Sequence, residues 1–307
     1  MNTEQFRWQS ILFITMIIWS SYFIVSKVLL KQYTPISLVI FRILFATLVL
    51  GIIYYGSKDR KQKKFTLTKR DIVLLTVSSL TGVLASSLFL MLSVKYIGAG
   101  LASILINTNP LFITFVAIVL KIEKGSYYKF LGIIIGIAGV ALVILKERGI
   151  THLLDNVHLQ GIIYALLSGV GATILTIIGK KELIHKMGGL AYTLFTLIPS
   201  AFILVLFYLI IDPSVFMVYS FSGLVGFLYI GIVATAFVWW LFASSLHHLD
   251  AGVASSFKLL IPPFSVILAY IFFHEHLSQQ AIIGMVCIIV GIYIVSNDQK
   301  IVNFFKK

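Results

Sequence analysis

The stretch Ala99-Gly100-Leu101-Ala102-Ser103 has a second copy, Ala251-Gly252-Val253-Ala254-Ser255, 152 residues further along the chain. At this shift, residues 98–145 and 250–297 align without a gap, and thirteen of the 48 paired positions are identical. Both copies lie in strongly apolar sequence. A membrane chain built from two similar halves is typical of secondary transporters.

The composition places most of the chain in a bilayer. Of its 307 residues, 59% are hydrophobic and 11% are charged, whereas a typical soluble domain carries about 25% charged residues. A helix needs about 20 mostly apolar residues to cross a membrane. Ten stretches qualify: 9–30, 36–56, 72–94, 98–120, 128–146, 159–179, 189–211, 222–246, 251–273 and 280–296. We therefore predict an all-α integral membrane protein with ten transmembrane helices.

The placement of basic residues predicts the topology. With the N-terminus inside, 17 Lys and Arg residues fall in inner loops and ends, against five outside. The positive-inside rule then puts both termini in the cytoplasm. Because each repeat has five spans, an odd number, the halves must be inverted relative to each other: 1–146 and 159–307, joined by an external linker at 147–158. The net charge of +13 thus indicates a membrane topology and not a nucleic-acid partner.

Prolines interrupt the fourth and ninth predicted spans at matching positions. Pro110 lies midway along one, and Pro262 and Pro263 lie midway along the other. An interior proline removes a backbone hydrogen bond, and in lipid the freed carbonyl needs another partner. Breaks at matching positions in two halves point to a transporter's substrate site. We expect the three prolines to act as hinges, with Asn107 and Asn109 lining the site.

Two basic residues, Arg42 and Lys258, fall inside predicted spans. Charges at membrane depth usually face a cavity, although either side chain is long enough to snorkel to a headgroup, and both interpretations remain open. Lys27, nearer a helix end, is expected to snorkel. All eleven Asp and Glu lie in loops or at helix ends, so the usual proton carrier is missing and an anionic substrate is favoured. Trp19 and Trp239 are candidates to line an apolar pocket, with packing as the alternative.

Motifs for catalysis or metal binding are missing from the sequence. It has no H-E-x-x-H, no Cys cluster and no phosphate-binding loop, and Cys287 is its single cysteine. His274-Glu275-His276 does not suit a metal, because neighbouring positions on a helix do not face each other. We expect no enzyme, no metal and no cofactor. The G-x-x-x-G pair Gly132 and Gly136 allows close helix packing, either in a homodimer or within one chain.

Several motifs resemble EamA-type members of the drug/metabolite transporter superfamily. They are the first-span stretch from Trp19 to Lys27, Phe41-Arg42, the hairpin patterns 92–100 and 246–252, and the proline and glutamate pairs Pro110 with Glu123 and Pro262 with Glu275. The resemblance covers nearly the whole chain. It implies two inverted five-helix repeats around a central cavity, with the fifth and tenth spans outside it. It also implies a multi-pass protein of the bacterial plasma membrane that exports or exchanges amino acids and related small metabolites.

Lys258 departs from the family's pattern, which leaves room for an anionic substrate. We therefore expect a secondary transporter of a small metabolite, working by alternating access in the lipid bilayer. Its expected substrate-binding residues are Trp19, Arg42, Asn107, Asn109, Trp239 and Lys258. A flippase or a drug-efflux permease would share this architecture. A membrane sensor or a lipid-modifying enzyme is the alternative from another class, but a sensor would need an output domain, and an enzyme a polar cluster at one membrane face.

Overall fold

The computed structural model describes residues 3–57, 65–119, 126–146, 156–210, 220–245 and 257–297. These segments are helical and contain no strand. The first half holds α1 (Thr3–Leu29), α2 (Pro35–Gly56), α4 (Lys69–Ser78), η1 (Ser79–Ala85), α5 (Ser86–Ile97), α6 (Ala99–Ile106), α7 (Asn109–Val119) and α8 (Tyr127–Lys146). The second half holds α10 (Asn156–Ile178), η2 (Gly179–Leu183), α11 (Ile184–Met187), α12 (Gly189–Ile210), α13 (Phe221–Leu228), η4 (Tyr229–Phe237), α14 (Val238–Ser245), η5 (Phe257–Leu260), α16 (Ile261–Phe273) and α17 (Gln279–Ser296).

The prediction of an all-helical membrane protein is confirmed. Within the described ranges, six helices are long and apolar enough to cross a bilayer, and three shorter apolar helices accompany them. The helices follow the apolar stretches closely: the stretch predicted at 36–56 is α2, which begins at Pro35. This agreement has a physical reason, since a chain in lipid must satisfy its backbone hydrogen bonds internally and a helix does so locally.

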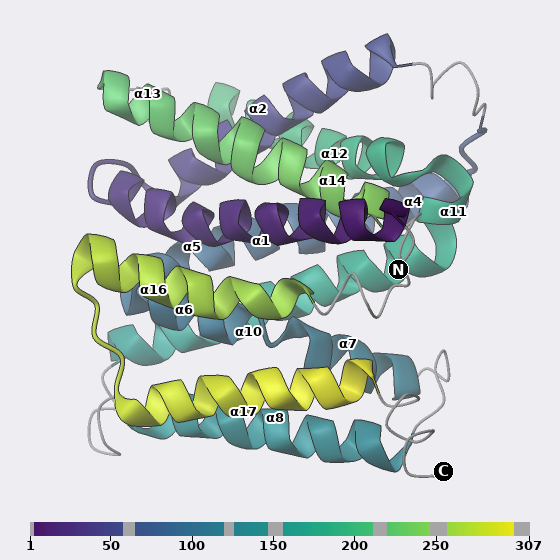
Figure 1. Ribbon diagram of the computed structural model, residues 1–307. Helices are drawn as coiled ribbons and strands as arrows, with labels where there is room; N and C mark the ends of the chain where they lie inside the picture. The colour runs from purple at the N-terminus through teal and green to yellow at the C-terminus, as the bar shows by residue number, and fades with distance from the viewer. Residues whose placement is uncertain are drawn as a thin grey trace.

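Helix α1 runs through the middle of the bundle, between α14 and α16 (Figure 1). It also contacts η4, η5 and α6, so elements of both halves meet on it. The pair α8 and α17 lies at one edge and packs mainly on itself (Figure 1). The first turn of α1 and the last turn of α17 lie at the same end of the bundle (Figure 1).

Glycines allow α8 and α17 to pack in close contact. A Cβ added at Gly132 would lie 2.6 Å from the carbonyl oxygen of Gly291, and one at Gly139 would lie 2.6 Å from that of Gly284. No side chain larger than hydrogen fits at such separations. At Gly136 an added Cβ would instead meet the side chain of Leu111 in α7, at 2.5 Å. Of the two alternatives for the G-x-x-x-G pair, the structure therefore supports packing within one chain.

At the interruption between α6 and α7, polar side chains donate hydrogen bonds to backbone carbonyls of α6. Asn107 Nδ2 donates to the carbonyl of Ser103 at 2.7 Å, and Thr108 Oγ1 donates to that of Leu105 at 2.7 Å. These two carbonyls of the last turn of α6, which also accept the backbone N–H groups of Asn107 and Thr108, thus gain a second donor. Pro110 is the second residue of α7, where a missing N–H costs nothing because that donor would have no helical acceptor.

The second interruption has a similar form. Pro262 and Pro263 lie in the first turn of α16, directly after the short 3-10 helix η5. Ser20 Oγ on α1 donates to the carbonyl of Ile261 at 3.3 Å. Ser265 donates to Ser103, so the interrupted spans pack on each other as well as on α1.

Two wide π-helical segments also occupy matching positions. Segment η1 lies in the third span of the first half, and η4 lies in the corresponding span of the second half. At the 152-residue shift of the sequence repeat, η1 falls on residues 231–237, the last seven of η4. Short π segments inside α-helices occur frequently at functional sites.

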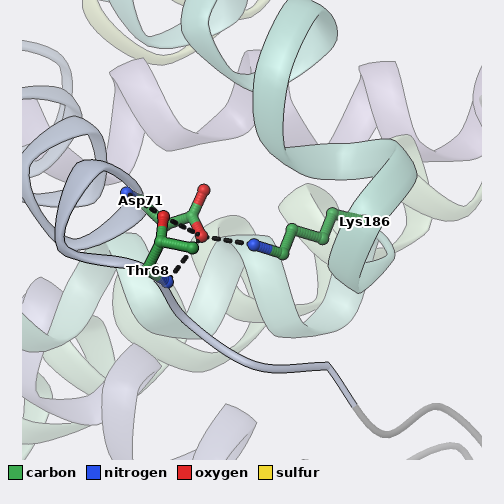
Figure 2. A network of polar contacts seen from close by, with 3 residues as sticks. All are labelled: Thr68, Asp71 and Lys186. Carbon is green, nitrogen blue, oxygen red and sulfur yellow. Dashed lines mark hydrogen bonds and ion pairs between the residues drawn. The ribbon is translucent and has the colours of Figure 1, made fainter.

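Ion pairs join the two halves at opposite ends of the bundle. At one end, the carboxylate of Asp71 accepts hydrogen bonds from Thr68 at the start of α4 and from Lys186 in α11 (Figure 2). At the other end, Glu275 pairs with Lys27 of α1 and accepts from the backbone N–H of Gly100 in α6 at 3.1 Å. Lys27 was expected to reach a lipid headgroup. In the structure its ammonium pairs with Glu275, which lies 248 residues away in the chain.

Candidate functional site

Arg42 lies between the halves and is almost fully buried. It sits on α2 with 5% of its surface exposed. Its Nε donates to Thr235 Oγ1 at 2.8 Å, and its Nη1 donates to Tyr22 OH and to Ser87 Oγ, each at 2.9 Å. Its guanidinium carbon also lies 4.8 Å from the ring centroid of Tyr22 and 5.4 Å from that of Trp239. We call these five residues the Arg42 site.

The Arg42 site contains charge without a counter-charge. Thr235, Tyr22 and Ser87 are neutral acceptors, and across the described segments no carboxylate pairs with Arg42. Its second terminal nitrogen, Nη2, has no acceptor among the described residues. The indole Nε1 of Trp239 is a second buried donor without a described partner. Unused donors beside an uncompensated cation favour an anionic group of a ligand.

The Arg42 site includes one residue of the π-helical segment η4 and one residue that closely follows the π-helical segment η1. Thr235 belongs to η4, and its hydroxyl donates to the carbonyl of Ile230, five residues earlier, at 2.6 Å. Ser87 follows η1 by two residues. Ser87 and Trp239 are themselves 152 residues apart. Two positions related by the 152-residue shift therefore both contact one guanidinium.

Lys258 forms a second cationic centre. It lies in η5, and its Nζ is 4.2 Å from the ring centroid of Phe242 and 5.6 Å from that of Trp19. These two rings meet edge to face at 6.2 Å between centroids. No ion pair or hydrogen bond joins Lys258 to another described residue. We call Lys258, Trp19 and Phe242 the Lys258 site.

The six residues expected at the site fall into three groups. Arg42 and Trp239 lie together, and Trp19 and Lys258 lie together. Asn107 is engaged with the backbone of α6. Asn109 lies against Gly169 of α10: a Cβ added at Gly169 would lie 3.8 Å from the Cβ of Asn109. Neither asparagine has a contact with Arg42 or Lys258 in the described segments.

The sequence analysis did not assign Tyr22, Ser87, Thr235 or Phe242 to the site. A lone serine or threonine in an apolar span gives no local signal, since its hydroxyl usually bonds the carbonyl one turn back. The repeat offered one signal: the position 152 residues before Trp239 is Ser87. Phe242 could have been found from its spacing, because it lies one helical turn from Trp239.

In comparison with known proteins, both halves of the chain match the same family model. The model of the EamA-like transporter family matches residues 6–145 and again residues 159–297. An uncharacterized transporter of Clostridium kluyveri is 26% identical over 295 residues, which cover 96% of this chain and 94% of the relative. An uncharacterized transporter of Archaeoglobus fulgidus is 28% identical over 288 residues, covering 93% of this chain and 97% of the relative.

A solved crystal structure supports the fold. It superposes with a TM-score of 0.67 and covers 94% of this chain and 98% of its own. The sequence identity is 15%, so the likeness concerns the arrangement of helices alone.

Proposed function

This chain belongs to the EamA-like transporter family, and on that premise we propose that it carries a small anionic metabolite across the plasma membrane by alternating access. The observation that carries the proposal is the pair of cations, Arg42 and Lys258, without an acidic partner in the described segments. Both lie among aromatic rings where the halves meet.

Compensation of the two positive charges favours an anionic solute. Removing a charge from water costs several kcal/mol, and this cost is recovered only where a counter-charge or several hydrogen bonds are supplied. Among the described residues, the buried Arg42 has three hydrogen bonds to neutral groups, and the half-buried Lys258 lies against the faces of two rings. An anionic solute would supply a counter-charge to Arg42 and to Lys258, and the aromatic rings would contact its apolar part. A permease for lipophilic cations is disfavoured, because both residues would repel its substrate.

The expected architecture remains part of the proposal. We take the two halves as inverted repeats of five spans, with the termini in the cytoplasm and the solute exported or exchanged. Supporting observations are the double match to one family model and the common end reached by the start of α1 and the end of α17 (Figure 1). The excess of basic residues in the inner loops supports the same orientation.

Alternating access would use the ion pairs at the two ends. Lys27 with Glu275 and Asp71 with Lys186 each join a residue of the first half to one of the second. With both pairs formed, access from either side is restricted. Release of one pair at a time would open the Arg42 and Lys258 sites to one side, and the interruptions at Pro110 and Pro262 would serve as hinges.

The proposal is tested by uptake into proteoliposomes. Labelled amino acids, monocarboxylates and dicarboxylates are offered to the wild type and to Lys258→Ala. The matched control is Lys95→Ala, because Lys95 also lies over an aromatic ring, Tyr96 at 5.9 Å, but is exposed at the end of α5. We expect uptake of an anion that Lys258→Ala impairs and Lys95→Ala preserves. Unchanged affinity of Lys258→Ala for every transported anion would remove Lys258 from the site.

A further inference from the structure

The two cationic sites lie on one interface, between α1 and α14. Trp19 and Tyr22 are three residues apart on α1, and Trp239 and Phe242 are three residues apart on α14. The two helices pack against each other and run in opposite directions (Figure 1). Antiparallel packing matches Trp19 with Phe242 at one level and Tyr22 with Trp239 at the next.

Each level holds one cation. Lys258 contacts Trp19 and Phe242, and Arg42 contacts Tyr22 and Trp239. Three residues of α-helix rise about 4.5 Å, so the two levels are separated by about one helical turn.

A solute with one negative charge would leave one of these cations uncompensated. Two positive charges on neighbouring levels of one interface repel each other, and the repulsion grows as water is excluded. Contact with an aromatic face attracts a cation but does not neutralise it. A solute with two anionic groups, one directed to each level, would meet both Arg42 and Lys258.

We infer that the transported solute carries two anionic groups, one bound at the Arg42 site and the other at the Lys258 site. This inference rests on the proposed function and narrows its substrate class to dianions, such as four- and five-carbon dicarboxylates. At the Arg42 site, Nη2 and the indole N–H of Trp239 are donors without an acceptor among the described residues. Three hydrogen bonds already fix the guanidinium, so this site holds its group in a defined orientation.

Lys258 has a different role. Its ammonium is a point charge on a flexible stem, and it is not fixed by any described hydrogen bond. It therefore selects for the second charge without demanding one geometry. This makes Lys258 the residue that distinguishes a dianion from a monoanion, while the Arg42 site contacts both.

The test compares ligands that differ by one charge. Succinate is paired with monomethyl succinate and glutarate with monomethyl glutarate, and affinities are measured calorimetrically on purified full-length protein. In the wild type we expect the dianion to bind at least about tenfold more tightly, as for loss of one charge-assisted hydrogen bond. In Lys258→Gln that ratio should fall close to one. Lys258→Arg and the exposed control Lys95→Gln should keep it.

The outcomes separate the two proposals. Equal binding of dianion and monoester by the wild type would overturn the inference and leave an anion transporter. A preference that survives in Lys258→Gln would overturn the assignment of Lys258. Should no anion of the panel bind and no anion be taken up by proteoliposomes, both proposals are wrong. If Lys258→Gln does not fold, the test uses Lys258→Arg, which keeps the positive charge. The affinity ratio of dianion to monoester must then persist in Lys258→Arg.

Discussion

Glu275 is the residue whose neutralisation should most directly open one end of the bundle. Its carboxylate pairs with Lys27 and accepts from the N–H of Gly100, in the first turn of α6. The change Glu275→Gln keeps the size of the side chain and removes the charge. It therefore weakens the contacts of α6 and α1 with the segment that follows α16.

The magnitude follows from the exposure of the pair. The side chains of Lys27 and Glu275 are 28% and 19% exposed, so screening reduces the ion pair to about 1 kcal/mol. The negative charge at the N-terminus of α6 contributes about 0.5 kcal/mol more. Together these terms amount to about 1.5 kcal/mol, which corresponds to roughly a tenfold shift toward the open end.

The assay is the labelling of one buried cysteine. Ser103, on α6, is fully buried and donates to the carbonyl of Gly100 at 2.7 Å. Ser103→Cys in a Cys287→Ser background gives a protein with one thiol. A membrane-impermeant maleimide added from outside should react about ten times faster when Glu275→Gln is also present.

The control is Glu182→Gln. Glu182 pairs with Arg70 at 3.2 Å, at the opposite end of the bundle. If Glu182→Gln accelerates labelling as much as Glu275→Gln, the bundle is loosened in general and the gating role of Glu275 is refuted. Labelling that changes less than twofold in Glu275→Gln refutes it as well.

Three further outcomes are expected. Arg42→Lys should lower uptake of the transported anion by at least about tenfold, because an ammonium cannot reproduce the forked contacts of a guanidinium; uptake within twofold of the wild type would contradict this. Gly139→Leu should destabilise the packing of α8 on α17 by about 1–3 kcal/mol, measured by thermal unfolding in detergent. Gly51→Leu is its control, because nothing lies within 4 Å of a Cβ added there, and equal losses would contradict the packing argument. Asp71→Asn and Lys186→Gln should each accelerate maleimide labelling from the side opposite to that opened by Glu275→Gln, and faster labelling from the same side would contradict two separate gates.

Much of the site depends on contacts that no local pattern encodes. Arg42 was singled out because a charge in an apolar span is costly. Its hydrogen-bond partners Tyr22, Ser87 and Thr235 lie 20, 45 and 193 residues away. Hydrogen bonds between residues so far apart in the chain depend on which helix faces pack together. The hydropathy pattern does not predict that packing.

The asparagines illustrate a limit of motif reasoning. Asn107 and Asn109 were expected to line the site because they precede Pro110. The side chain of Asn107 donates to the carbonyl of Ser103 in the last turn of α6, and its place at the site stays a prediction. A polar residue beside a break thus has a local backbone role as well as a potential ligand role, and sequence does not distinguish them.

The apolar helices, the positions of their interruptions and the duplication of the chain can all be predicted from the amino-acid sequence. These features depend on local hydropathy and on the missing N–H of proline, so nearby residues suffice to predict them. The packing of α8 on α17, the ion pair of Glu275 with Lys27, and the successive levels of Arg42 and Lys258 on one interface emerge from the folded chain alone. Each of these contacts joins segments far apart in the chain, and its geometry is fixed by which helix faces meet.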